Sequence, residues 1–237
     1  MRLHRGGPAP RAAPKGLILQ GPSHLVISWF LADASGLEKP RERRIVAWSG
    51  LAPDFDVVAY VVALLWYRFD KELAFENVWK VVHHRYTHNF AFVLAMGAVA
   101  YALARGDGRA RLRVAVLAMF ACALHNFLDL VGGGPTWPIY PLWPASEFPW
   151  HAAWSWTIGE WPNVAILAAC LIGTLAYGRF AGYSPLECFG DSADRWMVAV
   201  LRQGSVPSSG RLRIAIWAAV LIAAVAILAP LGFNPFR

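Results

Sequence analysis

The chain has 237 residues, of which 57% are hydrophobic and only 16% are charged. Soluble domains carry about 25% charged residues, so the composition excludes an ordinary soluble domain and indicates a membrane protein. The formal net charge of +7 would suit a nucleic-acid partner, but the basic residues cluster between apolar stretches, as they do in cytoplasmic loops. We therefore expect no direct binding of nucleic acid.

The N-terminal residues 1–16 are rich in Gly, Pro and Arg and predict a disordered basic arm. The remainder, 17–237, reads as a single helical membrane domain without internal repeats. Its first apolar stretch, 17–33, contains the pair Gly21–Pro22, so we expect the helix to begin near Ser23.

Further apolar stretches approach the roughly 20 residues that a helix needs to cross a bilayer. They cover residues 45–67, 89–104, 112–131, 163–180 and 213–232. The first of these is interrupted by Pro53, which removes a backbone hydrogen bond and disfavours an unbroken helix. The pattern predicts an all-α, polytopic membrane protein with about five to six membrane segments, some of them short or re-entrant.

The connecting loops differ in charge. Basic residues gather in 39–44, 105–113 and 181–212, and loops rich in Lys and Arg stay in the cytoplasm. Residues 132–162 contain no Lys or Arg but hold six of the 12 tryptophans, so we expect this Trp- and Pro-rich loop on the outer side. Within 181–212, apolar residues at helical spacing beside two arginines predict an amphipathic helix on the cytoplasmic surface.

Ionisable residues lie inside several predicted spans, where they are costly and usually functional. Counted from the nearest basic loop at about 1.5 Å per residue, they all fall roughly 15–25 Å from the cytoplasmic face. They are His24, Asp54, Asp56, His88, His125 and Asp129. Because chain direction alternates between segments, this common depth predicts that the residues meet in the outer half of the membrane.

Two of the local patterns suit metal binding. His125 and Asp129 are four residues apart, so they share a helix face and could chelate one ion or hydrogen-bond to a neighbouring helix. Asp54 and Asp56 are two apart beside Pro53, and two carboxylates in a low dielectric repel unless a cation or proton lies between them. An aspartate that caps a re-entrant helix would explain one of them but not both.

The stretch "HHRYTHN", residues 83–89, adds three histidines. His84 and His88 are four apart and could share a helix face, whereas His83 and His88 could converge only if the segment between them is irregular. Arg85 is a candidate anion clamp, or an arginine that snorkels to the membrane interface.

Imidazole and carboxylate groups together suit Zn²⁺ or a similar divalent ion. The candidate ligands are His24, Asp54, Asp56, His83 or His84, His88, His125 and Asp129. One catalytic zinc uses about three protein ligands. The surplus therefore indicates either two ions or one ion with a surrounding hydrogen-bond network.

Five motifs carry a resemblance to a known family: "PSHLVISWFLA", "LAPDFD", "HHRYTHN", "ALHNFLDLVGGG" and "IYPLWP". With them, residues 22–146 resemble the bacterial predicted inner-membrane metal-dependent hydrolases, described as LexA-binding and inner-membrane-associated. The resemblance implies a multi-pass protein of the inner membrane, a bound divalent metal and a hydrolase reaction, but no particular substrate. A more distant likeness is to the all-helical, zinc-dependent phospholipase C.

The family pattern aligns a histidine with His24, a Leu-Pro-Asp-x-Asp motif with residues 52–56, and His-x-x-x-Asp with residues 125–129. Its His-Arg-Gly-x-Thr-His-Ser motif aligns with residues 83–89 and favours His83 over His84 as the ligand. The chain departs from the pattern at Ala52, His84, Arg85 and Asn89.

The sequence thus predicts a membrane-embedded hydrolase in which metal-activated water attacks a lipid-linked ester or phosphoester. Asp54 or Asp56 would be the general base, Arg85 would hold the substrate anion, and membrane lipids are the expected partners. Two other functions stay open: a His/Asp-lined ion or proton transporter, and a non-catalytic scaffold that binds a cytoplasmic partner. The orientation of the N-terminus also stays open. The position of His24 in the outer half of the membrane places the N-terminus outside, whereas the basic arm favours the cytoplasm.

Overall fold

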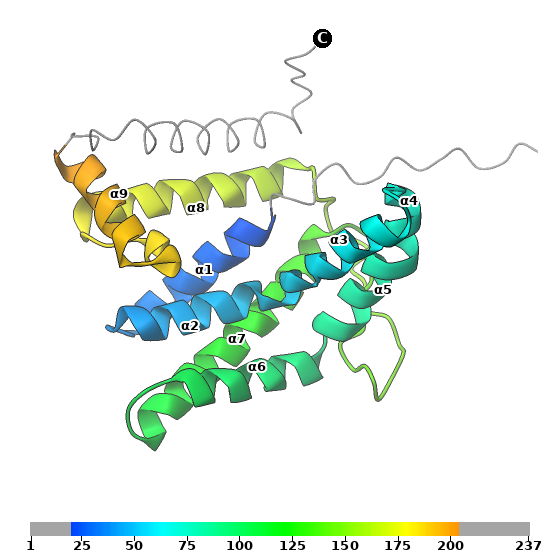
Figure 1. Ribbon diagram of the computed structural model, residues 1–237, viewed down its shortest axis with the longest axis horizontal. Coiled ribbons are helices and arrows are strands. Elements are labelled where there is room, and N and C mark those ends of the chain that lie inside the picture. The colour runs from blue at the N-terminus through cyan, green and yellow to red at the C-terminus, as the bar shows by residue number, and fades with distance from the viewer. Residues whose placement is uncertain (1–19, 204–237) are drawn as a thin grey trace, which may run out of the picture.

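The computed structural model describes residues 20–203, and the regular elements within them are helices (Figure 1). The all-α prediction is therefore confirmed for this part of the chain, while the arm 1–16 and the apolar stretch 213–232 lie outside it. The longer helices are α1 (Gln20–Ala34), α2 (Pro40–Leu51), α3 (Val57–Trp66), α6 (Phe90–Leu103), α7 (Gly108–Gly132), α8 (Trp161–Phe180) and α9 (Asp191–Gln203). The shorter ones are the 3₁₀ helices η1 (Ala52–Asp56) and η4 (Pro185–Phe189), the π-helices η2 (Phe75–Trp79) and η3 (His83–Thr87), and α4 (Lys71–Ala74) and α5 (Lys80–Val82).

Three helical runs among the described residues are long and apolar enough to cross a membrane, and a bent pair adds a fourth if its halves count as one span. The runs are Pro40–Trp66, Gly108–Gly132 and Trp161–Phe180, and the pair joins Lys71–Thr87 to Phe90–Leu103 at 66°. The bent pair agrees with the expectation of short or re-entrant segments. Contrary to the prediction, the helix does not break at Pro53 but narrows from an α-helix to the 3₁₀ helix η1 and then continues as α3.

The first helix begins before Ser23, earlier than predicted. α1 starts at Gln20, so Gly21 and Pro22 lie in its first turn rather than ahead of it. Proline is tolerated there because the first N–H groups of a helix have no partner within the helix.

Small residues let α2 pack closely against both α1 and α7. Ala32 of α1, Val46 of α2 and Ala121 of α7 are fully buried in one apolar cluster. Gly50 of α2 lies against Ser28 of α1: a Cβ built on Gly50 would stand 1.9 Å from Ser28 Oγ and 2.6 Å from Ser28 Cβ. Only glycine fits at this contact.

Replacing Gly50 by alanine is expected to lower the free energy of unfolding by about 1–3 kcal/mol, the usual cost of overpacking, because the new methyl group must push α1 away from α2. Gly108 is the control, since a Cβ there would meet nothing within 4 Å, and Gly108→Ala should not destabilise. Denaturant titration in detergent micelles measures both variants. Equal stability of the two would contradict the close contact between α1 and α2.

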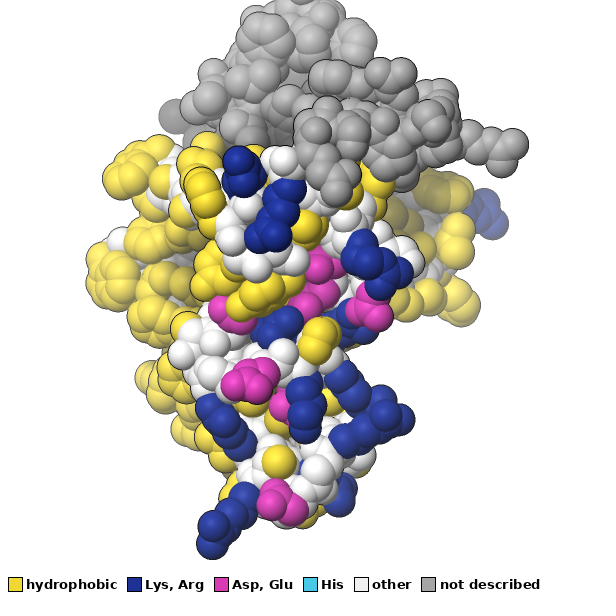
Figure 2. All heavy atoms as spheres, turned by 90° about the vertical axis from the view of Figure 1, so that its left-hand side faces the viewer, with side chains coloured by type: hydrophobic (Ala, Val, Ile, Leu, Met, Phe, Trp, Pro, Cys, Tyr) yellow, Lys and Arg dark blue, Asp and Glu magenta, His cyan; other side chains and the backbone are white. Residues whose placement is uncertain are grey.

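The basic connections meet at one end of the helices, which is called the basic end below. Arg113 of α7 donates a hydrogen bond to the carbonyl oxygen of Ser35, after α1. Arg41 of α2 donates to the carbonyl oxygen of Leu103, at the end of α6, at 2.9 Å. Figure 2 shows Lys and Arg side chains gathered on this face, with carboxylates among them. The Trp-rich loop 133–160 lies at the opposite end (Figure 1).

A buried ion pair attaches η4 to α1 and α2. The Arg43 guanidinium donates two hydrogen bonds to the Glu187 carboxylate, at 2.7 and 2.8 Å, and Trp29 Nε1 donates a third at 2.7 Å. Arg43 also donates to two backbone carbonyl groups. Both charged side chains are buried, and they are fully hydrogen-bonded, as buried charges need to be.

The helix α9 forms within 181–212, the segment for which the sequence predicts an amphipathic helix. Its apolar Met197 and Leu201 lie against Gly178 of α8. Arg202 donates hydrogen bonds to backbone carbonyl groups at the C-terminal end of α8. The apolar face of α9 is thus covered in part by α8.

Candidate metal centre

Two carboxylates enter the site from η1. Residues two apart in a 3₁₀ helix project in different directions, and Asp54 and Asp56 accordingly approach different histidines. Asp54 Oδ1 lies 3.5 Å from His125 Nε2, and Asp56 Oδ2 lies 2.9 Å from His83 Nδ1. The Asp54 side chain keeps 24% of its surface exposed, against 1% for Asp56. Both aspartates therefore belong to the cluster, and Asp54 is the more exposed of the two.

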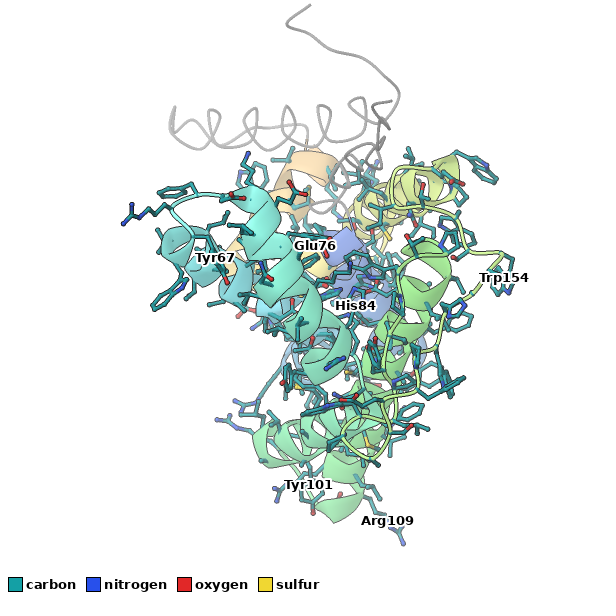
Figure 3. All side chains as sticks on the ribbon, turned by 90° about the vertical axis from the view of Figure 1, so that its right-hand side faces the viewer. Tyr67, Glu76, His84, Tyr101, Arg109 and Trp154 are labelled. Atoms are coloured by element: carbon teal, nitrogen blue, oxygen red, sulfur yellow. The ribbon has the colours of Figure 1, made fainter. Side chains whose placement is uncertain are left out.

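The π-helix η3 decides which histidine of "HHRYTHN" joins the site. Its hydrogen bonds join residues five apart, so it brings His83 and His88 together, with ring centroids 3.9 Å apart. His84 instead packs edge-on against Trp137, with centroids 4.4 Å apart. Figure 3 labels His84 near the centre of the view and Trp154, from the Trp-rich loop, at its edge. The irregular segment that a contact between His83 and His88 requires is therefore present, and His83 rather than His84 lies in the cluster.

Asp129 of α7 lies among four imidazole rings. Its Oδ2 is 3.0, 3.5 and 3.6 Å from the Nε2 atoms of His88, His125 and His83, respectively. Its Oδ1 is 3.2 Å from His24 Nε2. All five side chains are buried. The predicted convergence of groups from separate helices is confirmed, with contributions from α1, η1, η3, the residue that follows η3, and α7.

Hydrogen bonds fix which ring nitrogens face the centre of the cluster. His88 Nδ1 lies 2.7 Å from the carbonyl oxygen of His83, and His125 Nδ1 lies 2.7 Å from that of Gly50. Since a carbonyl oxygen only accepts, each Nδ1 carries the proton and each neutral ring presents an Nε2 lone pair. The two Nε2 atoms are 3.1 Å apart, beside Asp129 Oδ2. Three electron-rich atoms at this spacing repel unless a cation or proton lies among them.

The cluster fits a divalent metal ion. Both ring nitrogens of His24 and Oδ1 of Asp129 are buried and make no hydrogen bond of good geometry among the described residues, although Nε2 and Oδ1 lie 3.2 Å apart. Such atoms are costly to bury unless an ion holds them. Two sets of side chains each have their donor atoms within 4.8 Å of one another. One set is Asp54, His88, His125 and Asp129, the other is Asp56, His83 and His88, and both contain His88. This overlap is compatible with one ion or with two.

Asp56 is held by several donors and orients His83. Trp79 Nε1 donates to its Oδ1 at 3.3 Å, and Thr87 Oγ1 donates to its Oδ2 at 2.8 Å. A carboxylate bonded to Nδ1 of a histidine fixes the ring so that Nε2 can face an ion. Neither Thr87 nor Trp79 is a site residue predicted from the sequence. The spacing of four residues between Trp79 and His83, whose rings lie 4.5 Å apart, is the signal that could have found Trp79.

Arg85, expected as an anion clamp, lies outside the cluster. Its Nη1 is 3.7 Å from Glu147 Oε1, and its guanidinium lies 5.0 Å from the centre of the Tyr140 ring, both in the loop 133–160. Within residues 20–203 its guanidinium makes no hydrogen bond or ion pair with the clustered histidines and aspartates. The position does not support a clamp and agrees with the alternative, an arginine that snorkels toward the interface.

Alanine at His83 is expected to weaken Zn²⁺ binding by on the order of 10–100-fold or more, the effect of losing a partner in a metal site. Alanine at His84 is expected to leave the affinity within a few-fold of wild type, because its ring packs on Trp137 and not on the cluster. Isothermal titration of both variants in detergent compares them directly. A larger loss for His84→Ala would reverse the assignment.

Comparison with known proteins places the chain in a family. The family model described as "YdjM inner membrane protein" matches residues 19–231, which include every residue of the cluster. No curated protein and no solved structure matches the chain. The family match and the candidate spans together assign the protein to the inner membrane. The chain belongs to the YdjM inner membrane protein family, known as LexA-binding, inner-membrane-associated predicted hydrolases.

Proposed function

We propose that the protein is a membrane-embedded, metal-dependent hydrolase that acts on a lipid-linked ester or phosphoester. One observation carries the proposal: the Nε2 lone pairs of His88 and His125 face each other beside Asp129 in a buried site between spans. Hydrogen bonding between helices would be a sufficient role for one histidine and one aspartate. It leaves several imidazole and carboxylate groups at this spacing without an explanation.

His88, His125 and Asp129 would hold the ion, with His24 and His83 close enough to complete its ligands. When bound, a divalent ion of the zinc type lowers the pKa of a coordinated water to about 7 and polarises the bond to be cleaved. The carbonyl groups that bond to Nδ1 of His88 and His125 keep both rings in the orientation that binding needs.

Asp54 is the better candidate of the two aspartates for the general base. Its side chain is partly exposed, and among the described residues it accepts no hydrogen bond, so it is free to take a proton from an attacking water. Asp56 is buried and already accepts hydrogen bonds from Trp79 and Thr87. We therefore assign proton transfer to Asp54 and the orientation of His83 to Asp56.

A lipid-linked substrate agrees with the surroundings of the site. Phe55, Val57 and Val58, next to the aspartates of η1, are exposed on a membrane-spanning run. Exposed apolar side chains on a span face lipid, so this flank borders the acyl chains and not an aqueous cleft. A substrate held in the membrane could approach along it.

The packing gives no support to a transport path through the described residues. Trp29, Val46 and Ala47 lie between the cluster and the basic end and are fully buried in apolar clusters. A proton or ion relay needs polar groups across the whole span. Beyond this apolar layer, Arg43 and Glu187 are bonded to each other.

Hydrolysis assays with Asp54→Asn test the proposal. Detergent-solubilised protein, loaded with Zn²⁺ or Mn²⁺, is offered lipid phosphomonoesters, phosphodiesters and carboxylic esters. We expect one class to be cleaved, and the variant to lose about 10²–10⁴-fold in rate, as for loss of a general base, while its metal content stays unchanged. Asp107→Asn is the control, because asparagine also serves at this exposed helix N-cap. Full activity of Asp54→Asn would remove Asp54 from the reaction, and failure of the metal-loaded wild type on all three classes would contradict the proposal.

A further inference from the structure

A groove with apolar walls runs between α2 and η1 on one side and α6 on the other, with a volume of about 630 Å³. Its walls include Trp48 of α2 and Met96 and Val99 of α6. Both walls belong to membrane-spanning elements, so the groove meets acyl chains rather than water. Its volume is in the range of about 300–1,000 Å³ that is typical of pockets for small ligands.

Two arginines stand where the groove reaches the basic end. Arg41 is exposed and donates one hydrogen bond, to the carbonyl oxygen of Leu103. Arg44 pairs with Asp191 through Nη2, and its side chain keeps 28% of its surface exposed. Guanidinium donors left free at a membrane surface attract phosphate groups. The basic end of the groove is therefore suited to an anionic headgroup.

The opposite end of the groove is formed by Asp56 and Thr87. Asp56 follows Arg44 by twelve residues in one helical run, so the two ends are about 18 Å apart. Half of a hydrocarbon core is about 15 Å thick. The groove is therefore about as long as the hydrocarbon of one leaflet, which matches a single acyl chain.

We propose that this groove binds an anionic phospholipid from the leaflet at the basic end. The phosphate lies at Arg41 and Arg44, and one acyl chain extends past Trp48 and Val99 to Thr87. This lipid is a ligand and not the substrate, because its phosphate is about 18 Å from the cluster. The inference is therefore independent of the proposed hydrolase activity.

Native mass spectrometry of the full chain in detergent, titrated with phosphatidylglycerol or phosphatidylcholine of equal chain length, tests the headgroup site. We expect one phosphatidylglycerol to be retained in preference to phosphatidylcholine. Arg41→Glu should weaken phosphatidylglycerol binding at least about fivefold, the contribution of one basic residue at a membrane surface. Arg109→Glu, an exposed change at the same end outside the groove, should leave binding unchanged.

A second pair of variants tests the chain site. Val99→Trp fills the groove from a position that is 46% exposed and should abolish retention of both lipids. Leu94→Trp, on the same helix but outside the groove, should not. Equal retention by these two variants, or equal binding of both lipids by the wild type, overturns the proposal. The proposal is also overturned if the wild type is a dimer without bound lipid and this dimer dissociates in Val99→Trp. The groove would then bind a second copy of the chain.

The metal content of the same samples is a separate readout. It should be unchanged in the four variants, since none of the replaced residues belongs to the cluster. Absence of lipid selectivity with normal metal content would overturn the lipid site alone. Absence of metal with normal lipid selectivity would overturn the proposed hydrolase alone.

Discussion

Asparagine in place of Asp129 is expected to lower the affinity for Zn²⁺ by more than about 100-fold. Residues that only orient the metal ligands cost about 10–100-fold when they are replaced, and the loss of a ligand should cost more. Four histidines approach this carboxylate, at 3.0 to 3.6 Å. The amide removes the negative charge that balances a cation and replaces one acceptor oxygen with an NH₂ group. The four imidazoles alone then have to hold the ion in a site of low dielectric.

Competition with a chelator of known Zn²⁺ affinity measures this loss. Glu76→Gln makes the same chemical change at an exposed carboxylate that pairs with Lys80, and it should bind metal like the wild type. The hydrolase rate of Asp129→Asn should fall with its metal occupancy and recover in part at saturating Zn²⁺. Affinity within tenfold of wild type would mean that metal binds elsewhere in the chain.

Glutamine at Glu187 is expected to cost up to about 3–5 kcal/mol of the free energy of unfolding, because it leaves the buried Arg43 guanidinium with only Asp33, 3.9 Å from Nη1, as a counter-charge. Arg43 and Glu187 are only 5% and 2% exposed, so water cannot replace the lost charge. The effect should appear in denaturant unfolding in micelles and leave metal binding by the folded protein intact. The site and this ion pair are separated by the apolar layer around Trp29.

Two comparisons isolate the buried pair. Asp191→Asn removes the exposed partner of Arg44 and should change stability by no more than about 1 kcal/mol. The double variant Arg43→Leu/Glu187→Leu removes both charges and should be more stable than Glu187→Gln, since apolar replacements of buried pairs are often neutral. A double variant less stable than the single one would show that the geometry of the pair, and not the unpaired charge, sets the cost.

Much of the candidate site was predictable from spacing and depth. His125 and Asp129 are four apart on an apolar helix, and the structure places them on one face with Nε2 and Oδ2 3.5 Å apart. The common depth of ionisable residues in separate spans predicted their meeting, because the membrane fixes the height of every helix. Depth alone therefore predicts the meeting, whatever the packing of the helices.

The choice between His83 and His84 was not available from local periodicity. An α-helical reading pairs His84 with His88, whereas the π-helix η3 pairs His83 with His88 instead. A π-helix has no sequence pattern of its own, and tertiary contacts decide whether it forms. The family resemblance favoured His83 where the spacing alone could not.

Arg85 and Trp79 show the limits of reasoning from neighbouring residues. Arg85 adjoins two histidines in sequence, yet it pairs with Glu147 of a distant loop. Trp79 looks like one more apolar residue, yet its indole N–H bonds to Asp56 from a separate element. Pairings of this kind depend on how a bent span and a long loop fold back on the bundle, which composition and spacing do not specify.

If imidazole and carboxylate groups from several helices jointly bind a divalent cation, the wild-type full chain must retain one. Protein purified in detergent, loaded with Zn²⁺ and passed through a desalting column, is analysed by elemental mass spectrometry. We expect one or two tightly held ions per chain, lost in the variant His125→Ala/Asp129→Ala. A folded wild-type protein that retains no divalent ion, or as much as that variant, would contradict this joint binding.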